Sequence, residues 1–289
     1  MDIIQVITDE LKVQKWQVEA AVKLIDEGCT IPFFLGYRKE ATGSLNDEQL
    51  RTLHERLLYL RNLEDKKNQV LTSIEEQGKL TPELKKQILD AKTLVVVEDL
   101  YRPYRPKRRT RAIIAKEKGL EPLANIIMLQ MTKKPLEEEA KAFLSEEKGV
   151  ETVEDALNGA KDILAETISD EADYRIYIRD LTMKKGSVAS AAKKPEESSV
   201  YEMYYEFEEP IKKLAGHRVL ALNRGEKEKI LTVKVNAPEE EILGWLQKQV
   251  LAKDNPITTP VLREVVEDSY KRLIAPAIER EIRSSLTEN

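Results

Sequence analysis

The sequence predicts a mainly α protein, a multi-helix assembly with a helix-turn-helix-like hairpin and a small β-hairpin. Charged residues make up 34% of the 289 residues and aromatic residues only 6%, with few glycines and prolines. That composition is typical of helices whose outer faces are solvated. Apolar residues recur at spacings of three and four through most of the chain, as amphipathic helices require. After Val200 the pattern changes to alternation, which favours strands.

The first segment, 1–78, is predicted to be an N-terminal helical bundle that contains one long helix. Ranges 2–12 and 16–28 have the pattern of two short amphipathic helices. The second of these helices carries its apolar residues at helical spacing and ends at Gly28, because glycine terminates helices readily.

The long helix of this segment is predicted to begin with a capping box. Asn46 supplies a side-chain acceptor, and Gln49 follows it three residues later. Glu64 and Lys67 interrupt the apolar seam of the helix, which favours a helical hairpin or bundle over a coiled-coil dimer. Gly78 is expected to end the helix. The seam consists of Leu50, Leu53, Leu57, Leu60, Leu71 and Ile74.

The second segment, 79–183, is predicted to be helical and to contain the helix-turn-helix-like hairpin, at 81–131. Its β-branched run Leu94–Val97 is compatible with a strand or with a buried helical turn. Thr110 is expected to cap a short helix that turns at Gly119 into a second one. Two short helices joined at a glycine are found in groove-reading proteins and, more commonly, in simple helical packing.

The C-terminal third of the second segment is predicted to be one long helix over 153–180. The stretch that follows, KKGSVASAAKKPEESS at 184–199, consists of small, polar and charged residues. Such a composition is typical of flexible connections. We therefore expect a flexible linker over 184–200.

The last segment, 201–289, is predicted to combine a β-hairpin with a long C-terminal helix that could pack back onto residues 1–78. Two alternating runs flank a turn at Arg224-Gly225, which places the hairpin near 217–236. The C-terminal helix, 260–286, contains Pro276, and a proline inside a helix is expected to kink it.

Cysteine usage and hydropathy indicate a cytoplasmic protein with no membrane partner. Cys29 is the only cysteine, so no intrachain disulfide can form, which is consistent with a reducing compartment. The N-terminus has acidic residues early and no long apolar run, so it does not resemble a secretory signal. No run of eighteen apolar residues occurs, as a membrane-spanning helix would need.

The most informative stretch is DLYRPYRPKRRTRAIIAKEK, from Asp99 to Lys118. Eight basic residues against two acids give a local charge of +6, so the rest of the chain, with a formal total of −5, sums to −11. A basic island in an acidic chain is where a polyanion would dock. The arginines and the lysine would contact phosphates, and the tyrosines would stack on bases. The candidate nucleic-acid-binding residues are Tyr101, Arg102, Tyr104, Arg105, Lys107, Arg108, Arg109 and Arg111.

A second interpretation of this basic segment remains open at the level of sequence. The cations could pair internally with Glu98, Asp99 or the Glu137–Glu139 run, and each such surface pair would contribute little. The sequence does not distinguish RNA from DNA as the ligand.

No pattern of catalytic or metal-binding residues is evident, so we expect no enzyme, no cofactor and no metal. Two histidines, His54 and His217, and one cysteine cannot supply the usual zinc ligands. Phosphate-cradling glycine loops and a nucleophile elbow are also missing from the sequence. The acidic runs Glu137–Glu139 and Glu239–Glu241 are expected at helix starts, where they complement the helix dipole.

Four blocks of the chain together resemble the Tex family of bacterial transcription accessory proteins. They occur in the order of the family and extend from near the start of the chain to its end. The blocks are IPFFLGYRKEATGSLNDEQLR (31–51), EDLYRPYRPKRRTRAIIAKEKGLEPLA (98–124), HRVLALNRGEKE (217–228) and RLIAPAIEREIRSSL (272–286).

The resemblance implies that this chain corresponds to the N-terminal helical region of such a protein. Proteins of the family are longer and continue into an RNase-H-like domain, helix-hairpin-helix units and an OB-fold RNA-binding domain. The function it implies is non-catalytic association with RNA or DNA in bacterial transcription. The alternative is a protein-interaction scaffold that docks RNA polymerase or the ribosome, or that braces the downstream domains.

Overall fold

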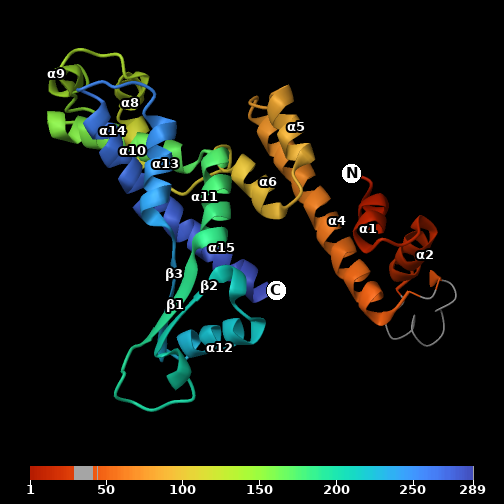
Figure 1. The fold of residues 1–289 in the computed structure, drawn as a ribbon. Coiled ribbons are helices and arrows are strands. Elements are labelled where there is room, and N and C mark those ends of the chain that lie inside the picture. Colours follow the sequence, from red (N-terminus) through yellow and green to blue (C-terminus); the bar gives the residue numbers. More distant parts are fainter. Residues whose placement is uncertain (29–41, 44, 289) are drawn as a thin grey trace. The chain divides into compact units, whose positions relative to one another are not determined.

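The computed structural model describes residues 1–28, 42–43 and 45–288, and Figure 1 shows its elements. The fold is mainly α with a small antiparallel sheet, which confirms the predicted class. Two compact units make up the chain, Met1–Tyr104 and Arg105–Asn289. The chain passes from one unit to the other within the predicted helix-turn-helix-like stretch, so each unit is described by itself.

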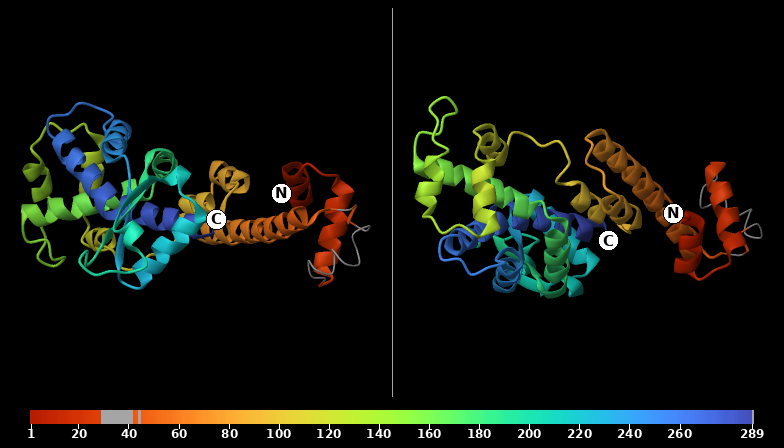
Figure 2. Two further views of the ribbon diagram at one scale, coloured as in Figure 1. Left: turned by 60° about the horizontal axis from the view of Figure 1, so that its bottom comes forward. Right: turned by 90° about the horizontal axis from the view of Figure 1, so that it is seen from above.

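Unit 1 is built around one 30-residue helix, α4, which both views of Figure 2 show in orange as an unbroken rod. Two helices pack on its N-terminal half and two on its C-terminal half. The capping box of Asn46 and Gln49 forms as predicted, through reciprocal bonds of 2.9 and 2.7 Å. The helices are α1 (Ile3–Leu11), α2 (Lys15–Asp26), α4 (Asp47–Glu76), α5 (Pro82–Asp90) and α6 (Leu94–Tyr101).

The buried seam of α4 follows the prediction in its first half and departs from it in the second. Lys67, predicted to interrupt the seam, lies within it and is only 1% exposed. Its ammonium donates a hydrogen bond of 2.7 Å to the carbonyl of Leu89, in the last turn of α5. Carbonyls of a last helical turn lack intrahelical partners and attract cations, so a lysine can be buried here. The buried residues of α4 are Leu50, Leu53, Leu57, Leu60, Leu63, Lys67, Val70 and Ile74.

Side-chain caps start the remaining helices of unit 1. Thr81 accepts from the Leu84 amide at the start of α5, and a proline occupies the first turn. The run Leu94–Val97, which the sequence allowed to be a strand or a helical turn, forms the first half of α6. Thr93 caps α6 by accepting from the Val96 amide.

Unit 2 has one continuous core, and helix α10 lies at its centre. Helices α7 and α8 are joined at Gly119, as predicted, and both pack on α10. The helices of this unit are α7 (Arg111–Glu117), α8 (Glu121–Leu129), α9 (Leu136–Lys141), α10 (Val153–Ser169), α11 (Ala172–Lys185), α12 (Gly216–Lys227), α13 (Glu239–Val250), α14 (Thr259–Asp268) and α15 (Ala275–Glu288), with a π-helical turn at Ser269–Ile274.

The sheet of unit 2 has three antiparallel strands in the order β2-β1-β3, and α12 and α15 contact β3 (Figure 1). Its strands are β1 (Ser187–Ala192), β2 (Glu206–Pro210) and β3 (Leu231–Asn236). Ser187 lies opposite Pro210 on one side and opposite Asn236 on the other. The prediction of a flexible linker over 184–200 is therefore wrong for 187–192, which is the central strand.

The small β-hairpin exists, but its predicted position near 217–236 is wrong. Residues 216–227 form α12, and the antiparallel neighbours in sequence are β1 and β2. Val219, Leu222 and Gly225 recur every three residues, a spacing that suits a helix and not an alternating strand, and all three are buried in α12. Gly225 serves close packing and not a turn, because a Cβ there would lie 2.5 Å from a side-chain carbon of Leu231.

Two predicted long helices are interrupted. The helix expected over 153–180 breaks between Ser169 and Ala172, where α10 ends and α11 begins. The C-terminal helix changes at Ser269–Ile274 into a π-helical turn, directly before Pro276. A π turn is one way in which a helix accommodates the missing N–H of proline.

None of the helices within the described ranges is both long enough and apolar enough to cross a membrane.

Candidate nucleic-acid interface

The basic segment is divided between the two units. Tyr101, Arg102 and Tyr104 belong to unit 1, and the residues from Arg105 to Arg111 belong to unit 2. The structure therefore brings together the second group as one surface, whereas the tyrosines have a different structural environment.

The unit 1 residues of the segment contribute to the packing of α6 on α4. The Tyr101 hydroxyl lies 2.9 Å from Ser73 Oγ, and Lys66 Nζ lies 5.7 Å from the centre of the tyrosine ring. The Tyr104 carbonyl accepts a hydrogen bond of 2.8 Å from Gln77. Tyr101, Arg102 and Tyr104 are all half-buried. The contacts of Tyr101 leave less of its ring available for stacking on a base.

Two of the acids considered as internal partners, Glu98 and Asp99, have interaction partners within the chain. Glu98 forms an ion pair with Lys66 at 2.9 Å. Asp99 is buried, with 1% of its surface exposed. The Glu137–Glu139 run lies in the first turn of α9, where its charge complements the helix dipole as predicted.

Lys107 anchors the unit 2 half of the basic segment. Its half-buried ammonium forms an ion pair with Asp170 and lies 3.8 Å from Glu166, both at the C-terminal end of α10. Thr110 then caps α7 by accepting from the Ile113 amide at 3.2 Å. Ala112 and Ala115 are the buried residues of α7. The backbone of residues 107–111 is thus fixed at both ends.

Three arginines next to Lys107 and Thr110 are exposed: Arg108, Arg109 and Arg111. Arg109 binds Glu117 with both of its terminal nitrogens, at 2.8 and 2.7 Å, and remains 63% exposed. Among the described residues, Arg108 and Arg111 have no hydrogen-bond or ion-pair partner. Arg105 is also exposed, and it has a partner within the chain.

Two lysines beyond the predicted site extend this surface along α7. Lys118 lines a groove of about 310 Å³ together with Arg111. Lys148 reaches the turn between α7 and α8, with Nζ 3.1 Å from where a Cβ of Gly119 would stand. The turns at Gly119 and Gly149 face each other, because Lys118 Cε lies 3.9 Å from where a Cβ of Gly149 would stand.

Acidic groups in the same groove limit its positive character. Asp155 and Asp162 also line it. Burial raises the pKa of Asp162 above its ordinary value, against the opposing charges of Arg272 and Arg111. Arg108 and Arg109 are exposed outside this groove, whereas the groove itself, which includes Arg111, is lined by both positive and negative side chains.

Sequence reasoning identified the arginines but not Lys148, and it counted Lys118 in the basic stretch without placing it in the site. Lys148 follows Lys118 by thirty residues, and no local pattern connects the two turns. The block 31–51 and Cys29 fall largely outside the described residues, so their predicted roles stay predictions.

Comparison with known proteins identifies two family models in the chain. The model described as "Tex-like protein N-terminal domain" matches residues 1–75, and the model described as "Tex central region-like" matches residues 130–289. The second match alone covers more than half of the chain.

Individual relatives are similar over nearly the whole chain. The protein named "Uncharacterized protein YdcI" from Bacillus subtilis is 49% identical over 98% of this chain, and the "Transcriptional accessory protein Tex" of Neisseria gonorrhoeae is 36% identical over 100% of it. The human "S1 RNA-binding domain-containing protein 1" is 31% identical over 100% of the chain. The chain spans 40%, 39% and 30% of the lengths of these three relatives.

Proposed function

Since this chain belongs to the Tex family, we propose that it contributes nucleic-acid contacts to a Tex-like transcription accessory protein, without catalysing a reaction itself. The name of the Neisseria relative describes transcriptional accessory function, and the name of the human relative describes an RNA-binding domain. We propose the bacterial cytoplasm as the place of this function.

The observation that carries the proposal is the fixed and exposed position of Arg108, Arg109 and Arg111. Their backbone is held by the Lys107 ion pairs and by the Thr110 cap, so little conformational entropy is lost when a ligand binds. Arg108 and Arg111 are not compensated by an ion pair from any other described residue. A fixed cluster of exposed cations, of which Arg109 alone has an ion-pair partner among the described residues, attracts phosphate groups.

Such a surface recognises the backbone of a nucleic acid and not its sequence. Contacts to phosphate fix the position of a ligand but carry no base information. Stacking on Tyr101 is opposed by its bond to Ser73 and by Lys66 near its ring. We therefore propose binding that is dominated by phosphate contacts and that depends steeply on salt.

The test is fluorescence anisotropy of the chain with labelled single-stranded RNA and duplex DNA over a salt series. Reversal of all three arginines to Glu should weaken binding at least tenfold at low salt, about 1.4 kcal/mol. If each arginine contacts one phosphate, the slope of log affinity against log salt should also fall by about two to three.

A matched control reverses three other exposed cations of unit 2, Arg263, Arg280 and Lys248, to Glu. Both triple variants change the net charge equally, so a loss confined to the first one locates the site. Equal losses in the two variants would indicate a general charge effect, and unchanged affinity of the first variant with an intact fold would exclude the proposed contacts.

The alternative function, a scaffold that docks RNA polymerase or the ribosome or braces downstream domains, is favoured by the internal pairing of Lys107 and Arg109. In that case the chain would bind neither RNA nor DNA even at low salt. A pull-down from lysate that resists nuclease and survives the triple reversal would then support the scaffold.

A further inference from the structure

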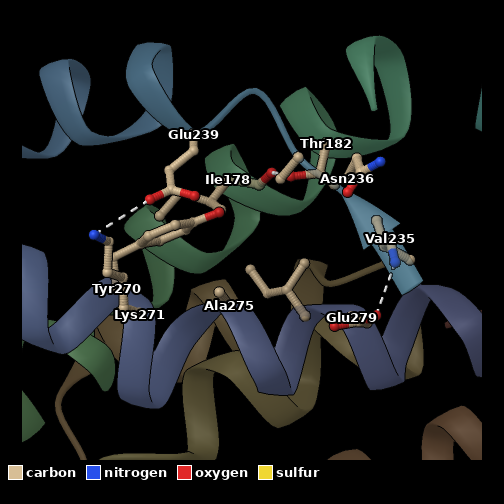
Figure 3. Close-up of a pocket in the computed structure, with 11 residues that line it drawn as sticks. Ile178, Thr182, Val235, Asn236, Glu239, Tyr270, Lys271, Ala275 and Glu279 are labelled. Carbon is tan, nitrogen blue, oxygen red and sulfur yellow. Dashed lines mark hydrogen bonds and ion pairs between the residues drawn. The ribbon is translucent and has the colours of Figure 1, made fainter. Parts of the chain in front are cut away.

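A pocket of about 450 Å³ in unit 2 (Figure 3) is lined by no residue of the basic segment. It is formed by α11, the end of β3, the start of α13, the π-helical turn and α15. Eleven residues line it: Ile178, Thr182, Val235, Asn236, Ala237, Glu239, Tyr270, Lys271, Ala275, Ile278 and Glu279.

Tyr270 lies in the π-helical turn and reaches into this pocket. The residue is only 3% exposed, and Figure 3 shows its ring pointing inward between Glu239 and Ala275. Its hydroxyl makes no hydrogen bond with any other residue in the described part of the chain. The ring is buried, but the hydroxyl is not among the fully buried polar atoms without a partner, so it is accessible from the pocket. It can therefore hydrogen-bond to a ligand or to solvent there, and π turns occur frequently at functional sites.

Two carboxylates give the pocket a negative charge. Glu279 accepts a hydrogen bond of 2.8 Å from the Val235 amide through Oε1. Glu239 lies 3.6 Å from Lys271, but Lys271 is shared with Glu267, which is closer at 2.7 Å. Among the lining residues, Lys271 is the only cation opposite Glu239 and Glu279.

The tyrosine is kept protonated by this environment. Burial, together with the charges of Glu239 and Glu279, raises the pKa of Tyr270 to about 12. At neutral pH its hydroxyl can donate to a carboxylate and accept from a cationic N–H at the same time. The polar groups of the pocket thus offer acceptors to a ligand that carries donors.

The remaining lining residues are apolar and suit a hydrocarbon stem. Ile178, Val235, Ala275 and Ile278 provide the aliphatic surface of the pocket. Side chains such as arginine and lysine bury an apolar stem and place a charged head among polar partners. The volume lies within the range of small-ligand pockets.

We propose that this pocket binds an alkyl guanidinium or alkyl ammonium group, with its stem on the aliphatic residues and its head among Tyr270, Glu239 and Glu279. This goes beyond the proposed nucleic-acid contacts and involves none of their residues. The chemistry is that of an arginine or lysine side chain of a polypeptide, and also that of a free alkylamine or alkylguanidine.

The test is isothermal titration calorimetry of the full chain with N-acetyl-arginine methylamide, and with N-acetyl-citrulline methylamide as its neutral isostere. We expect the arginine compound to bind at least tenfold more tightly than the citrulline compound. Agmatine and the peptide Gly-Gly-Arg-Gly-Gly separate the two sources: tighter binding of the peptide indicates a polypeptide ligand, and tighter binding of agmatine a free guanidine.

Two variants locate the binding, and one serves as a matched control. Glu279→Gln retains an oxygen that can accept from the Val235 amide but removes the charge, and should weaken binding at least tenfold. Tyr270→Phe removes only the hydroxyl and should weaken it severalfold. Glu240→Gln, at an exposed glutamate beside Glu239 in α13, should change nothing.

Three results would overturn the proposal. These are no heat of binding with 10 mM of the arginine compound, equal affinity for the citrulline compound, and unchanged affinity in both Glu279→Gln and Tyr270→Phe. The first would mean that the pocket holds solvent only. Circular dichroism and melting curves of each variant establish that a loss of binding does not come from a loss of the fold.

Discussion

Arg175 is the largest fully buried side chain of the described residues, and its replacement should destabilise unit 2 strongly. It lies in the first turn of α11 and is 1% exposed. Its guanidinium donates through Nε to the carbonyl of Ser169, at 2.5 Å, and through Nη2 to the Ser169 hydroxyl, at 2.8 Å. Ser169 is the last residue of α10, so its carbonyl has no acceptor role within that helix.

The magnitude follows from these two bonds. Hydrogen bonds to a charged group contribute about 1.5–3 kcal/mol each, so the pair contributes about 3–6 kcal/mol. Removing the guanidinium also removes the unfavourable burial of its charge, which offsets part of that loss. Arg175→Met keeps an aliphatic stem of similar length, so packing is largely preserved. We expect the free energy of unfolding to fall by about 2–4 kcal/mol.

The two tryptophans allow this measurement in one unit at a time, because Trp16 lies in unit 1 and Trp245 in unit 2. Trp245 stacks on Tyr177 of α11 with ring centroids 3.8 Å apart, so its fluorescence reports the packing of that helix. In a Trp16→Phe background, Arg175→Met should lower the urea midpoint by about 1–2 M, for a slope of about 2 kcal/mol/M.

Two further variants complete the experiment. Arg175→Lys should restore only part of the lost stability, because one ammonium cannot reproduce the fixed geometry of the guanidinium. Arg263→Met, at an exposed arginine of α14, should change stability by less than about 0.5 kcal/mol. An Arg175→Met chain as stable as its parent would refute the reasoning that this guanidinium joins α10 to α11.

The other predictions concern a buried lysine, two glycines and a tyrosine. Lys67→Met leaves the Leu89 carbonyl without its cation and should destabilise unit 1 by about 1–3 kcal/mol. The measurement is urea unfolding followed by Trp16 fluorescence in a Trp245→Phe background. An unchanged urea midpoint would argue against the hydrogen bond between Lys67 and Leu89. Gly159→Ala should destabilise unit 2 by about 1–3 kcal/mol, because the new Cβ would lie 2.3 Å from a leucine side chain. Gly244→Ala, in open space within α13, should instead stabilise unit 2 by about 0.5–1 kcal/mol. Urea unfolding that ranks the stabilities of the two variants in the opposite order would contradict this. Because the pKa of Tyr270 is about 12 when folded and 10.0 in its ordinary state, the neutral hydroxyl favours folding below pH 10, and this contribution is lost as pH rises from 10 to about 12. Tyr270→Phe should therefore unfold at a higher alkaline pH, followed by circular dichroism, and an identical alkaline transition would show that the tyrosine is not linked to folding.

Local signals predicted the helix starts well, because a cap is a short-range interaction. Asn46 and Thr110 each accept from the backbone amide expected from the sequence. The hydrogen bond connects residues three apart, so nothing distant is needed to recognise it. The same holds for the acidic first turns of α9 and α13.

The errors arise where a distant residue decides between two local alternatives. Local alternation places residues 216–227 in a hairpin, whereas they form α12, in which Gly225 packs closely against Leu231 and Tyr201. The stretch 187–192 has the composition of a linker, yet pairing on both sides makes it the central strand. Lys67 has the charge of a surface residue and is buried because the end of α5 presents a carbonyl to it.

The candidate site shows the same division between local and distant information. The arginines at 108, 109 and 111 are recognisable from the sequence because they lie together in it. The same local view assigns all eight candidates to one nucleic-acid site, whereas the structure divides them between two units and gives them different contacts. Lys107 is paired with α10 and Tyr101 with α4, and both have structural contacts that a ligand would have to disrupt.

A basic sequence is therefore not equivalent to a basic surface. An ion pair such as Lys107–Asp170 places one cation of the segment against α10 and, by fixing the backbone, holds the next residues outward. Neutralising Asp170 would remove a negative charge near the segment but would also release that anchor. Because phosphate binding benefits from a fixed geometry as well as from charge, the internal pairing of Lys107 and the exposure of Arg108, Arg109 and Arg111 are complementary features of one surface.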